Sequence, residues 1–147
     1  MEIAGESIQR IVEIARKHSR IAIIGFPGSG MRILSDELES LPDFEGYEFI
    51  HSEEFYFSTA EMQLIALIGV LGSSPKYIMD GCLGFRFLRK CEELNLTAVR
   101  PTCIIFVTSN IILEKHTPYV KGLCKIWLDF KILAERNNTQ YTYLEWG

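Results

Sequence analysis

The sequence predicts a single α/β domain with a mainly parallel sheet, and three observations support that prediction. Short β-rich runs alternate with helical patterns along the 147 residues, no repeat or low-complexity linker interrupts them, and the segment RIAIIGF (20–26) is apolar after its first residue. An unbroken apolar run of this length is typical of a strand buried on both faces. Strands separated by helices imply right-handed β-α-β crossovers, and therefore parallel neighbours.

About five strands are expected, with helices on both faces of the sheet. The helical segments are 7–18 (with Ser7 as its N-cap), 31–41, 59–72, 85–96 and 120–138, and the strands are 20–26, 47–52, 76–81, 103–110 and 139–146. Because the 20–25 strand is so apolar, we place it at the centre of the sheet, flanked by 76–80 and 103–108. We treat 1–147 as one domain, with an N-terminal helix in 1–19 and an α/β core over 20–147.

The composition argues against some classes of binding partner. A net charge of −4 argues against extended nucleic acid, which needs broad phosphate neutralisation, but it allows a small phosphorylated ligand. No apolar run approaches the roughly 20 residues that span a bilayer, so no membrane partner is expected. The cysteines, Cys82, Cys91, Cys103 and Cys124, form no C-x-x-C pair, which predicts reduced thiols in a cytoplasmic protein.

The glycine-rich segment GFPGSG (25–30) lies between the central strand and the next helix. Gly28 and Gly30 permit backbone angles that other residues resist, so that successive N–H groups can converge on one anion. The helix that follows adds its own free N–H groups and the positive end of its dipole. The segment therefore predicts a phosphate-binding loop, with a tight turn that binds nothing as the alternative.

This part of the chain resembles the Walker A segment of P-loop kinases, whose pattern is GxxxxGK[ST]. The residues that match its phosphate-binding positions are Gly25, Pro27, Gly28, Ser29, Gly30, Met31 and Arg32. Met31 and Arg32 replace the lysine that contacts phosphate and the hydroxyl that ligates magnesium. The resemblance implies a three-layer P-loop fold and ATP or GTP with Mg²⁺ as cofactor. The two replacements predict that phosphotransfer is weak or lost and leave open that no cofactor is used, while Arg32 could itself serve as a built-in cation.

Other segments resemble small phage-type nucleoside and nucleotide kinases. There, an acidic pair after the second strand supplies a catalytic base, which implies Glu53 here, with a solvated acidic turn as the alternative. The acid that ends the third strand holds magnesium through water, which implies Asp80 as a catalytic and metal candidate. The lid region, 114–128, and the arginine-bearing helix before it imply that Arg86, Lys121 and Lys125 reach phosphate.

Three functions remain open at this point. The first is a nucleotide-binding or phosphate-binding protein of kinase-like fold with little phosphotransfer. The second is a catalytically inactive relative that serves as a protein-interaction or assembly module, with a protein partner in place of a substrate. The third is a superfamily 3 helicase-like ATPase fragment, because PTCIIFVTSN (101–110) resembles the strand whose asparagine senses the γ-phosphate in those helicases. The missing lysine favours a protein that is not an enzyme.

Overall fold

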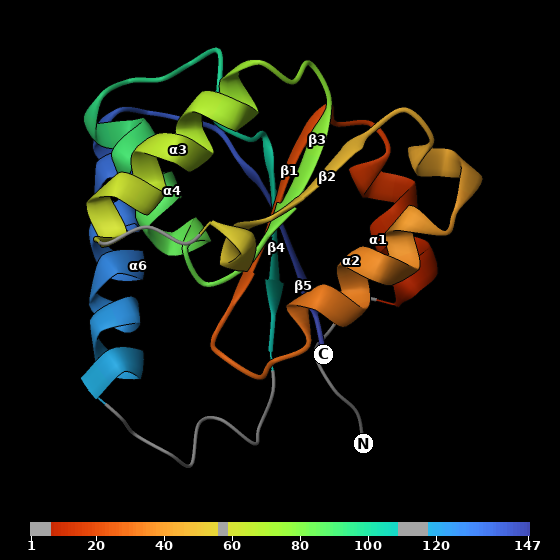
Figure 1. Ribbon diagram of the computed structural model, residues 1–147, viewed down its shortest axis with the longest axis horizontal. Helices are drawn as coiled ribbons and strands as arrows, with labels where there is room; N and C mark the ends of the chain where they lie inside the picture. Colours follow the sequence, from red (N-terminus) through yellow and green to blue (C-terminus); the bar gives the residue numbers. More distant parts are fainter. Residues whose placement is uncertain (1–6, 56–58, 109–117) are drawn as a thin grey trace.

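The computed structural model describes residues 7–55, 59–108 and 118–147. They contain one five-stranded, all-parallel sheet in the order β2-β3-β1-β4-β5 (Figure 1). The strands are β1 (Arg20–Gly25), β2 (Glu48–His51), β3 (Tyr77–Asp80), β4 (Cys103–Val107) and β5 (Thr142–Trp146). The predicted fold class is confirmed, as are the central position of β1 and its two neighbours.

Helices cover both faces of this sheet, which makes the predicted three layers. Figure 1 shows α1 (Ile8–Ala15) and α2 (Met31–Glu39) on one side, and α3 (Ala60–Gly72), α4 (Gly84–Glu93) and α6 (Pro118–Arg136) on the other. Two short 3-10 turns, η1 (Pro42–Phe44) and η2 (Ser52–Glu54), flank β2. Among the described residues, no helix combines the length and the apolar character that crossing a membrane demands.

Local sequence signals explain where several helices begin and end. The hydroxyl of Ser7 accepts a hydrogen bond from the Arg10 N–H, as predicted, and Thr59 caps α3 in the same way through the Met62 N–H. Helix α6 begins at Pro118, two residues earlier than expected, because proline suits the first turn of a helix. Asn138 follows the end of this helix with a positive φ of 57°.

The core is divided between the two faces of the sheet by the alternation of side chains along β1. Ile21 and Ile23 pack with α1 and α2, whereas Ala22 and Ile24 pack with α3, α4 and α6, and all four are fully buried. A strand buried on both faces holds its carboxyl end rigidly. The segment that follows it, the glycine loop, is therefore anchored at the centre of the sheet.

Candidate functional site

The glycine loop connects β1 directly to the N-terminus of α2. Gly28 and Gly30 have φ values of 81° and 102°, which are the left-handed conformations that favour glycine. A Cβ atom on Gly25 would lie 2.8 Å from the carbonyl oxygen of Val107, so β4 packs too closely for any other residue at that position. The predicted loop therefore has the backbone conformation that its glycines indicated, and it sits at the carboxyl edge of the sheet.

The side chains at the two replaced positions point in different directions. Met31 is 5% exposed and packs in the core between the sheet and the helices α1 and α2. The half-exposed Arg32 places its Nε 3.2 Å from Asp36 Oδ1, and its Nη1 3.9 Å from Glu54 Oε2. The hydrogen bond to Asp36 and the charges of Asp36, Asp80 and Glu54 raise the pKa of Arg32, against an opposing effect of desolvation. Position 31 therefore stabilises the core, and position 32 carries a fixed positive charge beside the loop.

Asp80 ends β3 and is completely buried. His51 lies opposite it in the register of β2 and β3, and its Nδ1 is 2.5 Å from Asp80 Oδ2. The other carboxylate oxygen, Oδ1, has no hydrogen-bond partner. The same is true of the buried hydroxyls of Ser29, Ser35 and Ser52. Ser35 lies within α2, whereas Ser29, Ser52 and Asp80 lie where β1, β2 and β3 end, which makes this edge of the sheet the candidate site.

Because Gly81 has no side chain, Ser52 and Glu53 can pack against its backbone. Its φ is 130°, and a Cβ atom there would overlap the Ser52 hydroxyl and lie 3.0 Å from Glu53 Oε2. Desolvation raises the pKa of Glu53, and the negative charge of Asp80 adds to that rise, while a backbone hydrogen bond, His51 and Arg32 oppose it. Glu53 therefore lies close enough to Asp80 for the two charges to interact.

An open cleft of about 410 Å³ adjoins the loop. Its lining comes from the loop, η2, α3, the turn between β3 and α4, α4 itself and the first turn of α6. The lining residues are Pro27, Ser52, Glu53, Ala60, Gln63, Cys82, Leu83, Arg86 and Tyr119. Burial raises the pKa of Cys82 to about 11, so this thiol stays protonated at neutral pH. The same cleft contains two ionisable groups of opposite sign, Glu53 and Arg86, next to Pro27 of the glycine loop.

The predicted phosphate-reaching cations are only partly brought together. Arg86 lines the cleft, but Arg89, one turn on, pairs with Asp129 of α6 at 3.3 Å and lines a different surface. Lys125 also pairs with Asp129, at 3.5 Å, and Lys121 is an exposed residue of α6 that does not line the cleft. The lid residues Lys115 and His116 lie outside the described residues, as does Asn110 of the helicase-like strand.

A magnesium ion does not fit the donors that the structure offers. Neither oxygen of Asp80 is exposed, and His51 already holds one of them. The position that would supply a hydroxyl carries the Arg32 guanidinium, which repels a cation. Within the described ranges, no group of three or more His, Cys, Asp or Glu side chains could hold a metal ion.

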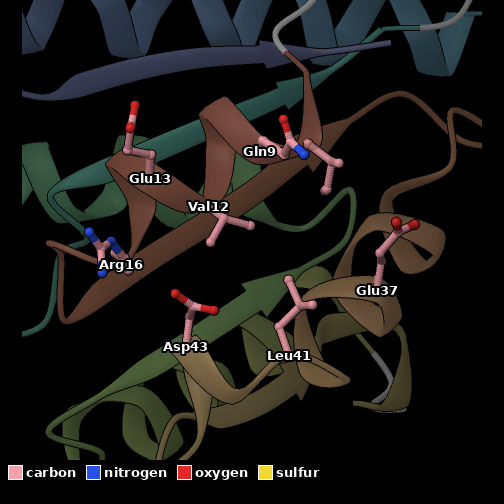
Figure 2. A pocket seen from close by; sticks show the side chains of 8 residues that line it. Gln9, Val12, Glu13, Arg16, Glu37, Leu41 and Asp43 are labelled. Carbon is pink, nitrogen blue, oxygen red and sulfur yellow. The ribbon is translucent and has the colours of Figure 1, made fainter.

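A second cavity, of about 380 Å³, lies between α1 and the end of α2 that is farthest from the loop (Figure 2). Val12 and Leu41 point toward one another across it in Figure 2. Its lining comprises Ile8, Gln9, Val12, Glu13, Arg16, Glu37, Leu41 and Asp43. None of these side chains is a nucleophile, and none is a buried charged group, so we assign no chemistry to this cavity.

No protein-family model matches this sequence, and no curated protein matches it. The candidate site therefore depends on the geometry of the chain itself. Sequence reasoning gave no role to five residues that contribute to the cluster or the cleft, namely His51, Ser52, Gln63, Cys82 and Tyr119. His51 could have been found, because adjacent parallel strands that both end in polar residues bring those residues to one edge.

Proposed function

We propose that the protein binds a nucleotide, or another phosphorylated small molecule, on the loop at 25–30, with phosphotransfer weak or lost. The observation that carries the proposal is the position of the loop. Its two left-handed glycines lead into the N-terminus of α2, and Pro27 of the loop lines one cleft together with Ser52 of η2 and Arg86 of α4. Free backbone N–H groups and the helix dipole make this a favourable place for an anion.

The surrounding charges also suit a phosphate ester. Arg32 follows the loop in the first turn of α2, Arg86 lines the cleft that Pro27 of the loop also lines, and this cleft has room for the remainder of the ligand. A volume of about 410 Å³ lies within the range of about 300–1,000 Å³ that is usual for small-molecule sites. ATP and GTP are the ligands that this site is proposed to take, and the four free cysteines suit the reducing cytoplasm.

Slow or absent catalysis follows from the side chains at positions 31 and 32. Phosphoryl transfer depends on positioning and on neutralising charge at the transferred group. Met31 is in the core and donates no hydrogen bond, while Arg32 supplies charge but no metal ligand. Glu53 could still act as a base toward an acceptor hydroxyl in the cleft, which is the one catalytic role that this geometry supports.

The burial of Met31 favours one second candidate, an inactive relative that serves as an interaction or assembly module. A methionine that has become part of the core stabilises the fold whether or not a ligand binds. In that case the loop is only the turn between β1 and α2. The helicase-like alternative receives no support from the described residues.

A thermal-shift panel of ATP, GTP, ADP, nucleoside monophosphates and inorganic phosphate, each with and without magnesium, separates these functions. A ligand at 100 times its Kd adds about 2.7 kcal/mol to the free energy of unfolding, or roughly 5–10 °C in a domain of this size. We expect such a shift with at least one nucleotide. The absence of any shift across the panel would favour the interaction module.

A further inference from the structure

The acid at the end of β3 is held in place by protein groups instead of facing the loop as a free ligand. Asp80 is 0% exposed, and its Oδ2 accepts a hydrogen bond from His51 Nδ1 at 2.5 Å. The exposed fraction of the His51 side chain is only 11%, so the pair is shielded from water. A divalent cation, or its bound water, would have to displace His51 to reach this oxygen, and the unpartnered Oδ1 belongs to the same fully buried side chain.

A protein cation lies close to this pair. Arg32 is on the first turn of α2, and its charge interacts with Asp80 as well as with Glu54 and Asp36. Its ion pair with Glu54 links α2 to η2, which directly follows His51. Because the guanidinium has five N–H donors and these two contacts use Nε and Nη1, the Nη2 donors are available to a phosphate oxygen.

From this arrangement we infer that the protein binds its phosphate ligand without a divalent metal, with the Arg32 guanidinium as the resident cation and the His51–Asp80 pair closing the site to magnesium. The inference rests on the proposed function and adds the form of ligand taken, which is the metal-free anion. An arginine is a suitable replacement because it is always charged and matches phosphate geometry.

The test is isothermal titration of the full chain with ATP, in EDTA and in excess magnesium chloride. The inference predicts binding in EDTA that is at least as tight as binding in magnesium. Binding only in the presence of magnesium would overturn the inference and leave the proposed function standing. No binding in either buffer, with ATP or with inorganic pyrophosphate, would overturn both.

Variants of Arg32 then identify the cation. Arg32→Gln should weaken ATP binding in EDTA by about tenfold to a hundredfold, because one charge-assisted contact is lost. Arg32→Lys should recover part of that loss, because it keeps the charge but not the planar fork. The matched control is Arg136→Gln. Arg136 is the last residue of α6, at the opposite end of that helix from Tyr119 of the cleft, and this variant should bind ATP as the unaltered chain does. Equal affinities for Arg32→Gln and Arg136→Gln would contradict the role of Arg32, and the metal dependence of the unaltered chain tests the inference without any variant.

Discussion

The two ends of the sheet carry two buried carboxylates in opposite circumstances. At the amino ends of the strands, Glu92 of α4 accepts hydrogen bonds from Asn137 Nδ2 at 3.0 Å, Thr139 Oγ1 at 2.9 Å and Tyr141 OH at 2.5 Å. The Nη1 atom of Arg100 lies 3.5 Å from Glu92 Oε2. Both of its oxygens therefore have partners, as buried charges require.

At the carboxyl ends, Asp80 has one partner, His51, and one oxygen with none. The hydroxyls of Ser29 and Ser52, which follow β1 and β2 at the same edge of the sheet, are also without partners. The difference teaches that the amino end of the sheet is organised for stability. The carboxyl end retains serine hydroxyls without partners, and a hydroxyl of this kind can donate a hydrogen bond to a ligand oxygen.

The largest expected effect compares isosteric variants of the two carboxylates. Glu92→Gln should lower the free energy of unfolding by about 3 kcal/mol, because the charged member of a buried, fully bonded cluster is lost. Asp80→Asn should change it by no more than about 1 kcal/mol, because the amide oxygen can still accept from His51 and one buried charge is removed. Urea unfolding of both variants measures the contrast. Equal losses would show that the two ends of the sheet do not differ in this way.

The dependence of the free energy of unfolding on pH tests the same comparison. Burial alone raises the pKa of Glu92, but hydrogen bonds from Tyr141, Asn137 and Thr139, with the charge of Arg100, lower it below the usual 4.5. A carboxylate whose pKa is lower in the folded state stabilises the protein above its unfolded pKa, and that contribution is lost as the pH falls through the folded pKa. Urea unfolding at a series of pH values should therefore show a steeper loss below about pH 4.5 for the unaltered chain than for Glu92→Gln. Parallel curves would contradict the role of this cluster.

At the carboxyl end, restoring the standard loop residues should change ligand binding. Met31→Lys should raise the affinity for ATP in EDTA by about tenfold, because a lysine ammonium that leaves the core toward the loop adds a second cation. Met31→Lys combined with Arg32→Ser should gain less, because it also removes the guanidinium that binds the metal-free phosphate. Calorimetric titration in EDTA measures both, with a melting curve to show that each variant folds. If neither variant changes the affinity, the interaction module becomes the better account of the protein.

The last prediction concerns the loop backbone. Gly25→Ala should cost about 1–3 kcal/mol in the free energy of unfolding, because a Cβ would lie 2.5 Å from Ser29 Oγ and 2.8 Å from Val107 O. The control is Gly69→Ala in α3, where a Cβ meets nothing within 4 Å, and where alanine should add about 0.5–1 kcal/mol. Thermal unfolding of the two variants should therefore move in opposite directions.

Much of the fold could be predicted from the sequence, because its signals are local. The apolar run of β1 placed that strand at the centre, and the glycines at 25–30 indicated the loop between it and the next helix. A fifth strand was also expected at 139–146, and the structure has β5 within that segment, paired with β4. Each of these features depends on residues that are close together along the chain.

The site was harder to predict because its contacts join distant segments. His51 and Asp80 are 29 residues apart and meet only through the register of β2 and β3. Arg86 and Arg89 are three residues apart on α4, yet Arg89 pairs with Asp129 of another helix and does not line the cleft. The sequence showed that Met31 breaks the lysine pattern, but its place in the core depends on packing between α1, α2 and the sheet.

The most direct test of the phosphate-binding loop is a titration of ¹⁵N-labelled protein with inorganic pyrophosphate, followed by amide NMR spectra in EDTA. The account predicts saturable shifts concentrated in the backbone amides of residues 28–32 and in the Arg32 Nε–H signal. The amides around the cavity of Figure 2 serve as an internal control and should not move. Shifts that are absent, or that are confined to surfaces away from the loop, would contradict the assignment of a phosphate site to this protein.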